Sequence, residues 1–534
     1  MAEPETQQEK RPPRDIRWWP AIVLVLAALL AIVWVRWRGD WPFQQRNLAT
    51  AQIGIIAALL LVVWWTFFSR ARWRLRWGAV GGLIGLIATG TAMFRFRGVS
   101  GDLVPILEFR WTKRAVPAAA PVIAEISSGS GLQRTHFTTY VDFPEFLGPD
   151  RNGVLPGPQL DTNWTAHPPA VLWRQKVGAA WSGFVISSGD ICLTQEQRGE
   201  DECVVARELT TGRQLWLHAD PAHYNTVIAG EGPRATPTVV GNRVLTCGAT
   251  GILNCLELAT GRLVWTRNVV AESGGKLPEW GIASSPLWAG GLVIVHGGNS
   301  TPRSLLAFHA EDGRPAWSGA ANHSYASPSL ATLAGVSQVL AFSSRVITAH
   351  DPATGNKLWE SPWGSGNVVC SSPVVVGSNR VVFSSGYGFG AELLEISRDE
   401  ANSKLAARLV WKSIRMKAKF AHLFAREDCL YGLDDGIFTC VDLKDGSLRW
   451  KEGRYGHGQG LLVSDLYLLM AESGELVLLR PTPAAPNELA RFRVFNAKTW
   501  NPLALSGDLL LVRNDQEAAC LRLKLAAREN GQEW

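Results

Sequence analysis

Eight side chains suited to ligand binding or proton transfer stand at equivalent places between residues 145 and 534. Each precedes a short apolar run that we expect to form the inner strand of a repeated sheet; they are Trp181, Arg234, Trp280, Tyr325, Asn367, Lys419, His457 and Trp500. Arg234 and Lys419 suit an anion, because both donate charge-assisted hydrogen bonds. Trp280 and Trp500 suit a flat ring, and His457 could act as a general base. Gathered at one mouth of a channel, these groups would form a concave ligand site; the alternative is that they form turns and fill the channel.

A repeat indicates the elements that would position these side chains. A polar residue, Gly, three further residues and Trp recur in five copies, which are Thr211–Trp216, Thr260–Trp265, Asp312–Trp317, Thr354–Trp359 and Asp445–Trp450. Gly supplies the positive φ that a tight hairpin turn needs, and the runs on either side of it are typical of strands. We interpret the tryptophans as wedges between neighbouring sheets, not as ligand contacts.

The spacing of the repeat predicts the fold. Counting Trp173 as the first copy and Phe492 as a degraded last one, the intervals lie between 39 and 52 residues, which is the period of four-stranded propeller blades. Ser-Pro or Thr-Pro pairs, as at Thr236-Pro237, open the inner strands, where proline costs no ladder hydrogen bond. We predict an all-β, eight-bladed β-propeller of antiparallel blades, with seven blades as the alternative. The strands 509–512 and 519–523 should share a blade with the strand around Trp173, because joining the ends removes open edges.

The N-terminal part predicts a membrane anchor. Residues 18–35, 51–68 and 77–94 are three uncharged apolar runs, each near the length that crosses ~30 Å of hydrocarbon. We expect three transmembrane helices; the alternative for the first run is a cleaved signal peptide. The basic loop 70–76 predicts a cytoplasmic side, so the N-terminus is expected inside and the residues after Phe94 outside.

These assignments divide the chain into four parts. We expect a cytoplasmic N-terminus at 1–17, a membrane anchor at 18–94, an exported linker at 95–144 and the propeller at 145–534. The inner membrane would then hold the anchor, with the propeller in the periplasm.

The charge distribution argues against a nucleic-acid partner. The formal net charge is +6, but residues 1–114 hold 16 Lys and Arg against 7 Asp and Glu, and the remainder holds 37 against 40. The basic excess therefore flanks the apolar runs, and the propeller lacks a basic stripe for phosphates.

The repeat copies, together with Phe146–Pro149 and Asn152–Val154, resemble the pyrroloquinoline quinone (PQQ) repeat family of β-propellers over about residues 145–527. That family includes PQQ-dependent alcohol and glucose dehydrogenases and outer-membrane assembly propellers of the BamB type. The resemblance implies PQQ with calcium as a possible cofactor set at the channel mouth, with His457 or Glu279 as the catalytic base.

Several features depart from the dehydrogenases of this family. The chain has no Cys-Cys pair and no Cys-x-x-Cys-His haem motif, and only Glu279, Asn367 and the nearby Glu231 could offer calcium oxygens. We therefore favour a membrane-anchored module that binds envelope proteins or a small anionic or planar ligand, without catalysis. The alternatives are a PQQ-dependent alcohol or sugar dehydrogenase that passes electrons to membrane quinone, and an envelope assembly scaffold similar to BamB.

Six of the eight cysteines fall on opposite arms of predicted hairpins, as Cys192 with Cys203, Cys247 with Cys255, and Cys429 with Cys440. Cross-strand disulfides are one hypothesis for an exported domain, and small buried side chains between blades are the other. The spacing does not resemble a zinc site, so no metal site is expected.

Overall fold

The computed structural model describes residues 16–38, 41–112, 141–364, 366, 368–399, 401 and 404–526. The chain divides into two compact units, Met1–Arg114 and Ala115–Trp534. The candidate residue Asn367, the basic residues before residue 16 and most of the expected linker lie outside the described residues.

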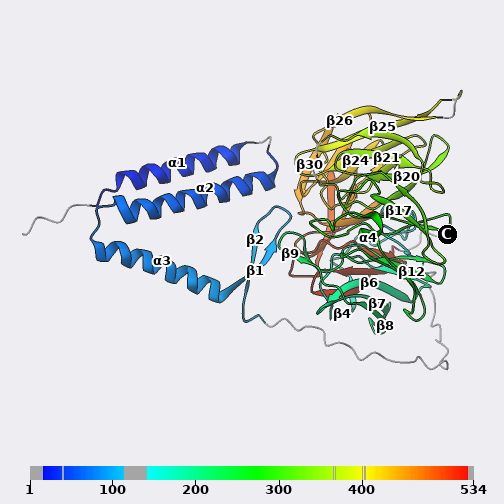
Figure 1. The fold of residues 1–534 in the computed structure, drawn as a ribbon, viewed down its shortest axis with the longest axis horizontal. Helices are drawn as coiled ribbons and strands as arrows, with labels where there is room; N and C mark the ends of the chain where they lie inside the picture. The colour runs from blue at the N-terminus through cyan, green and yellow to red at the C-terminus, as the bar shows by residue number, and fades with distance from the viewer. Residues whose placement is uncertain are drawn as a thin grey trace, which may run out of the picture. The chain divides into compact units, whose positions relative to one another are not determined.

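The N-terminal unit consists of three helices and a hairpin. The helices are α1 (Trp19–Trp37), α2 (Phe43–Val63), which continues as a π-helical turn over Trp64–Phe68, and α3 (Trp73–Met93), and the hairpin pairs β1 (Phe94–Val99) with β2 (Pro105–Phe109). Helices α1 and α2 lie side by side (Figure 1). All of the hairpin except Phe94 falls in the range 95–144, which was predicted to be an exported linker.

Among the described residues of this unit, two helices, not three, are long and apolar enough to cross a membrane: Trp19–Trp37 and Phe43–Phe68. The third predicted run does form the helix α3, but α3 carries Arg74 and Arg76 in its first turn. Five glycines and two threonines lower its hydropathy further. The prediction of three spans is therefore wrong by one.

The C-terminal unit is an eight-bladed β-propeller, as predicted (Figure 1). Blades 1 to 4 are β5–β8 (Val185–Ser187, Ile191–Arg198, Asp201–Glu208, Gln214–Asp220), β11–β14 (Thr238–Val240, Arg243–Cys247, Ile252–Glu257, Leu263–Asn268), β15–β18 (Leu287–Ala289, Leu292–His296, Leu305–His309, Pro315–Gly319) and β19–β22 (Ser329–Leu333, Val336–Phe342, Val346–His350, Lys357–Pro362). Blades 5 to 7 are β23–β26 (Val374–Val376, Arg380–Ser385, Gly390–Arg398, Leu405–Ser413), β27–β30 (Phe424–Arg426, Cys429–Asp434, Ile437–Asp442, Leu448–Arg454) and β31–β34 (Gln459–Val463, Leu466–Met470, Glu475–Pro481, Pro486–Arg493). Each is an antiparallel meander in chain order. A small hairpin, β9 (Asn225–Thr226) with β10 (Gly230–Glu231), and the short helix α4 (Val269–Ser273) lie between blades in the chain.

The eighth blade joins the two ends of the propeller. Its strands are β35 (Ala504–Ser506), β36 (Leu509–Arg513), β37 (Glu517–Arg522) and, from the start of the domain, β4 (Ala170–Lys176). Cys520 lies opposite Trp173 in this pairing, so the predicted shared blade is confirmed. The closure also contains a buried arginine: Arg513 of blade 8 donates to Thr194 Oγ1 and to the Gln195 carbonyl of blade 1, both at 2.8 Å.

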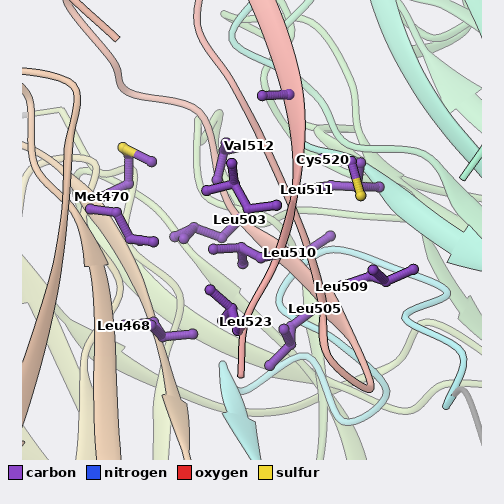
Figure 2. Close-up of a cluster of buried hydrophobic side chains, with 14 of the residues drawn as sticks. Leu468, Met470, Leu503, Leu505, Leu509, Leu510, Leu511, Val512, Cys520 and Leu523 are labelled. Atoms are coloured by element: carbon purple, nitrogen blue, oxygen red, sulfur yellow. The ribbon is translucent and has the colours of Figure 1, made fainter. Parts of the chain in front are cut away.

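The largest hydrophobic cluster lies at this closure. Figure 2 shows leucines of β36 together with Leu468 and Met470 of β32, and all of these side chains are buried. Aliphatic side chains thus fill the space between blades 7 and 8. Burial of each such side chain contributes about 1.5–3 kcal/mol, so the closing blade is held by packing as well as by strand pairing.

The repeat Gly and Trp lock neighbouring blades together. Gly261 in the β13–β14 turn has φ +70°, and a Cβ there would lie 2.4 Å from the Trp216 ring of the preceding blade. The Trp216 indole N–H donates to the Leu258 carbonyl of the same turn at 2.9 Å. The equivalent contact recurs for the other repeat glycines, which are Gly212, Gly313, Gly355 and Gly446. The tryptophans are therefore wedges between blades, as the sequence analysis expected.

The register corrects one repeat assignment. In every blade a bulge follows the residue that faces the repeat Trp, as at Cys255, which faces Trp265. In blade 7 the residue before the bulge is Leu478, and it faces Ala490. Ala490 therefore occupies the Trp position, and the choice of Phe492 is wrong by two residues because a sequence interval cannot locate a bulge.

The same register explains three of the eight cysteines. The residue opposite the repeat Trp is small in six blades: Ala206, Ala307, Ala349, Cys255, Cys440 and Cys520. Cysteine thus stands where other blades have alanine, and all eight thiols are free. Cys192 faces Arg207 and Cys203 faces Glu196, so this predicted pair is too far out of register for a disulfide.

Candidate functional site

The Ser-Pro and Thr-Pro pairs fix the loops that enter the inner strands. The Gly183 N–H donates to Thr236 Oγ1 at 3.0 Å, and the Thr236 N–H donates to Ser285 Oγ at 3.0 Å. The Ser285 N–H donates in turn to Ser327 Oγ at 2.9 Å. Each hydroxyl thus caps the equivalent backbone position of the preceding blade. This circumferential chain holds the residues just before it in fixed positions around one mouth of the channel.

On one side of the mouth two predicted residues meet. Trp181, before β5, and Trp500, before β35, have ring centroids 4.9 Å apart. The Lys498 ammonium lies 3.8 Å from the Trp500 ring centroid and 4.7 Å from that of Trp181. Phe420 packs on Trp500 from blade 6, with the centroids 4.9 Å apart. Sequence analysis missed Lys498 and Phe420, although each lies within two residues of a predicted site residue.

Across the channel a second aromatic group forms. Trp280, before β15, stacks on Tyr325, before β19, with centroids 5.2 Å apart, and Tyr325 Oη accepts the Trp280 backbone N–H. Tyr387, from the β24–β25 turn, lies 6.4 Å from Trp280. Burial raises the pKa of Tyr325 to about 12, so its phenol stays neutral at physiological pH. The sequence signal for Tyr387 was its position in the glycine-rich run Gly386–Gly390.

Lys419 and His457 join the two groups. Both are buried, and Lys419 Nζ lies 3.4 Å from His457 Nε2 and 5.6 Å from the centroid of the Tyr387 ring. Glu472 accepts the His457 backbone N–H at 3.0 Å and the Trp500 indole N–H at 3.0 Å. The mouth is therefore a connected wall of aromatic and charged side chains.

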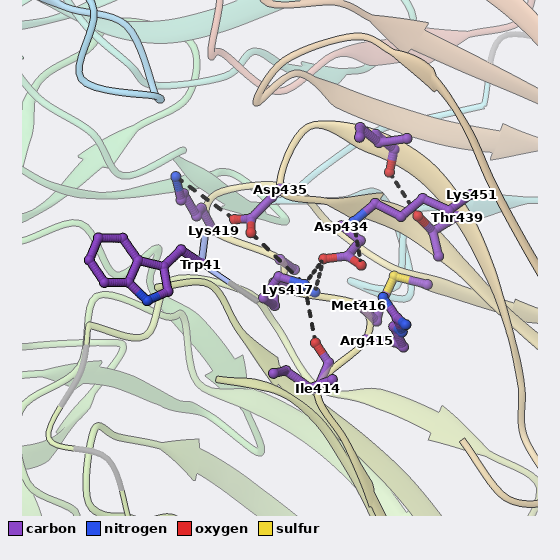
Figure 3. A network of polar contacts seen from close by, with 12 residues as sticks. Trp41, Ile414, Arg415, Met416, Lys417, Lys419, Asp434, Asp435, Thr439 and Lys451 are labelled. Carbon is purple, nitrogen blue, oxygen red and sulfur yellow. Dashed lines mark hydrogen bonds and ion pairs between the residues drawn. The ribbon is translucent and has the colours of Figure 1, made fainter. Parts of the chain in front are cut away.

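Lys419 also contacts a buried network of ion pairs. Figure 3 shows Asp434 and Asp435 among lysines, with Asp434 2.6 Å from Lys417 and 2.7 Å from Lys451. Burial alone would raise the pKa of Asp434, but these two ammonium groups hold it below its usual value. Burial raises the pKa of Asp435, whose carboxylate lies 3.9 Å from Lys419. The network keeps a net positive charge next to the mouth.

Arg234 is not placed as an anion ligand. Its guanidinium donates to the carbonyls of Ala229, Gly230 and Gly232 in the loop around β10. It also lies 4.5 Å from the centroid of the Tyr224 ring. These contacts fold the β9–β10 hairpin against the mouth and occupy the guanidinium that the sequence analysis assigned to an anion.

The two candidate bases come from opposite blades of the ring. Glu279 is exposed and precedes β15 of blade 3, whereas His457 is buried and precedes β31 of blade 7. Blades 3 and 7 face each other across an eight-bladed ring. Each therefore stays a separate hypothesis for a base, as the sequence analysis gave them.

Residues 143–155 fill part of the channel below the mouth. Phe143 bridges to Ile186 of β5, and β3 (Val154–Leu155) pairs in parallel with β31. At the tip, buried Arg151 pairs with Glu145 at 2.6 Å and donates to the Pro286 carbonyl at 3.0 Å. The segment forms a floor that sequence analysis did not foresee.

The residues at the mouth do not fit PQQ with calcium. A bound PQQ needs cations for its carboxylates and a slot for its rings. Lys498 and Lys419 are cations of the mouth, but Arg234 is occupied by carbonyls, and the indoles of Trp181 and Trp500 contact each other and leave no slot between them. Calcium needs grouped oxygen ligands. No cluster of three His, Cys, Asp or Glu side chains suited to a metal occurs in the part of the chain that the structure describes.

Comparison with known proteins identifies the repeat. Residues 200–452 match the sequence model of a PQQ-repeat family described as outer membrane protein assembly factor BamB. The crystal structure of a quinohemoprotein alcohol dehydrogenase from Comamonas testosteroni is 13% identical, with a TM-score of 0.53 over 73% of this chain and 82% of that chain. BamB from Moraxella catarrhalis is 16% identical, with a TM-score of 0.48 over 68% of this chain and 99% of that one. At such identities the structures share the fold alone. No curated protein sequence matches the chain.

Proposed function

Because this chain carries a β-propeller of PQQ repeats, we propose that it is a membrane-anchored binding module whose channel mouth receives a segment of a partner protein. The observation that carries the proposal is the aromatic wall of the mouth, whose members hold one another in place. Tryptophan and tyrosine dominate the binding energy of protein interfaces when they are rigid and partly exposed. Trp280, Tyr325, Tyr387 and Trp500 are all half-buried.

The indole N–H groups of Trp181 and Trp500 are already paired, whereas that of Trp280 is buried without a hydrogen-bond partner among the described residues. The Trp181 indole N–H already donates to the Ala229 carbonyl at 2.7 Å, and that of Trp500 to Glu472. Because these groups keep their partners when the mouth is covered, a protein surface can dock without leaving them unsatisfied. Lys498 and the Lys419 network add positive charge, so the partner segment should carry acidic and apolar side chains.

We propose that the propeller lies in the periplasm; the description of the matching family as an outer-membrane assembly factor supports this location. The sequence-based orientation of the chain assumed three membrane crossings, whereas two helices qualify as candidate spans, so that orientation does not support the location. A cysteine introduced at exposed Arg314 tests the side directly. It should react with a membrane-impermeant maleimide in intact spheroplasts, and labelling only after lysis would overturn the location.

Partner capture tests the function. We expect the full chain, purified in mild detergent from membranes, to retain one or a few specific proteins, and Trp500→Ala with Lys498→Glu to lose them. Arg314→Gln, which changes an exposed arginine away from the mouth, should retain them. Equal recovery with the mouth variant would refute the role of the mouth.

The enzyme alternative has its own test. PQQ and calcium added to the purified chain should give no tight binding and no dye reduction with alcohols or sugars. Micromolar binding with substrate-dependent reduction would replace this proposal by a dehydrogenase.

A further inference from the structure

The hairpin that follows α3 has one face made only of large apolar side chains. Strand β1 pairs with β2 so that Phe94 lies opposite Phe109 and Phe96 lies opposite Leu107. The Phe94 and Phe109 rings have centroids 5.5 Å apart, and Trp111, just after β2, lies 4.7 Å from the Phe109 ring. We call these five residues the apolar face of the hairpin. Their side chains are between 39% and 65% exposed, so no other part of the unit covers this face.

The opposite face of the hairpin carries charge. Arg95 lies opposite Glu108 in the register, and the Glu108 carboxylate accepts from Arg95 at 2.9 Å and from Arg97 at 3.0 Å. Because successive side chains of a strand point to opposite sides, the charged and apolar sets lie on different faces. The hairpin is therefore amphipathic. A two-stranded sheet has too little area to bury such a face by itself, so its apolar side needs a second surface.

Hydrogen bonds tie both ends of the hairpin to helices of the same unit. At its base, Arg110 donates through its backbone N–H to the Met93 carbonyl and through Nε to the Thr91 carbonyl, both at 2.9 Å. At its turn, the Asp102 carbonyl accepts from Asn47 Nδ2 at 2.8 Å. Asn47 lies in the second turn of α2. The hairpin thus reaches from the C-terminal end of α3 to the N-terminal part of α2.

The contact with Asn47 indicates the depth at which the hairpin lies. Residues 44–46 of α2 are Gln, Gln and Arg, whereas residues 48–68 carry no charge. At a rise of 1.5 Å per residue this uncharged stretch is about 30 Å long, which matches the hydrocarbon core of a bilayer. A membrane that is crossed by this stretch has Asn47 at the boundary between hydrocarbon and headgroups. The hairpin turn, which is hydrogen-bonded to Asn47, lies at the same boundary.

The size and composition of the hairpin suit that boundary and not the hydrocarbon core. The strands have six and five residues, whereas a strand that crosses a membrane needs about 9–11. The outer edges of a two-stranded sheet also expose N–H and C=O groups, which hydrocarbon leaves unsatisfied. Aromatic side chains, tryptophan above all, are enriched where hydrocarbon meets the headgroups. Water and headgroups there satisfy the backbone while the apolar face enters the lipid.

We propose that the apolar face of this hairpin binds the lipid surface, with its five side chains among the upper acyl chains and the arginines of the other face among headgroups and water. The inference rests on the membrane anchor of the proposed function, but not on the partner site at the channel mouth. It gives the hairpin a role. The hairpin fixes the end of α3 at the membrane surface, from which the chain continues to the propeller.

Depth-dependent quenching tests the proposal on the full chain in vesicles of phosphatidylcholine and phosphatidylglycerol. A genetically encoded fluorescent amino acid replaces one residue at a time: Leu107 on the apolar face, Arg95 on the opposite face, or Leu29 near the middle of α1. The lipids carry a nitroxide either next to the headgroup or near the end of the acyl chain. We expect the shallow nitroxide to quench position 107 at least about twofold more than position 95. The deep nitroxide should quench position 29 most.

The three positions separate failure of the hairpin from failure of the anchor. Quenching at Leu29 without quenching at Leu107 would overturn the proposal and leave the anchor intact. No lipid quenching at either position would overturn both. Blue-shifted emission at Leu107 without lipid quenching would show that protein covers the face, and equal quenching at Leu107 and Arg95 would show that the faces are not distinguished; either result would overturn the proposal.

Variants of the apolar face give a second test. With the fluorescent residue in place of Trp111, Phe96→Ser combined with Leu107→Ser should lower quenching by the shallow nitroxide at least about twofold. Arg95→Gln, the matched change on the opposite face, should leave quenching unchanged. Phe96 and Leu107 are exposed, so the helices should fold in the double variant, and unchanged quenching in it would refute the role of the apolar face. Loss of partner capture at the channel mouth would leave these results unaffected.

Discussion

Gly261→Ala tests whether the repeat motif locks the blades through a contact between glycine and tryptophan. A methyl group at this position would lie 2.4 Å from Cε3 of Trp216, and the backbone has φ +70°. The left-handed conformation costs an L-residue roughly 1–2 kcal/mol, and overpacking adds about 1–3 kcal/mol. We expect Gly261→Ala to lower the free energy of unfolding by about 2–5 kcal/mol, which is the sum of both effects.

Gly241 in the same blade provides the matched control. It has φ +57°, but a Cβ there would meet nothing within 4 Å, so Gly241→Ala carries the conformational cost alone. Urea unfolding of the full chain in detergent, followed by near-ultraviolet circular dichroism, measures both variants. The difference between them, about 1–3 kcal/mol, isolates the contact with Trp216.

A double mutant makes the test stricter. In Trp216→Ala the ring is absent, so adding Gly261→Ala should cost no more than Gly241→Ala does. Equal destabilisation by Gly261→Ala and Gly241→Ala, or full additivity with Trp216→Ala, would refute the lock.

Three further outcomes follow from buried groups. Burial lowers the pKa of His296 to about 3 and that of His323 to about 4, whereas an unfolded histidine has a pKa of about 6.5. Below pH ~6.5 the unfolded chain therefore binds more protons than the folded chain, and a urea series should show the free energy of unfolding falling as the pH drops from about 6.5 toward 4. A flat profile would contradict buried neutral imidazoles. Its lysine partners lower the pKa of Asp434, so its contribution to the free energy of unfolding is present above pH ~4 and is lost as the pH falls through the folded pKa. Asp434→Asn should remove this loss at acidic pH and should destabilise the chain by about 3–5 kcal/mol at pH 7. A destabilisation below about 1 kcal/mol would show that the ion pairs are not needed. Cys520→Ala should change stability by less than about 1.5 kcal/mol, because alanine occupies the same position in three other blades, and a larger loss in the same titration would contradict the register.

The blade number and ring closure could be predicted from sequence because their signals are local. A Gly with positive φ and a Trp four residues after it mark the outer hairpin in five of the eight blades, and their period sets the blade length. The identity of the mouth residues followed from the same period, since each lies shortly before an inner strand. That Trp181 and Trp500, more than 300 residues apart, would lie at the same mouth was predicted in this way, whereas the contact between their rings was not.

What the sequence could not supply are contacts that depend on backbone geometry. Nothing in the residues around Arg234 indicates that three carbonyls of the preceding loop would bind its guanidinium. The bulge that puts Ala490 in place of the last Trp has no residue signature. The floor formed by residues 143–155 depends on a parallel pairing with β31, which is distant in sequence.

The length of an uncharged run was not enough to predict a membrane span in the N-terminal unit. An uncharged run of eighteen residues at 77–94 satisfied the length rule, but the helix that contains it begins at Trp73 and includes Arg74 and Arg76. The boundary of the helix, not the boundary of the apolar run, decides how much charge the segment carries.

Site-specific photo-crosslinking from the channel mouth tests the central claim most directly. A photoreactive amino acid in place of Lys498, which lies over both indoles of the wall, should give a discrete adduct with a partner protein in intact cells, and the same group in place of Arg314 should not. Adducts of equal yield at both positions, or none from the mouth under conditions where the chain is folded and in the membrane, would contradict a binding role for the mouth.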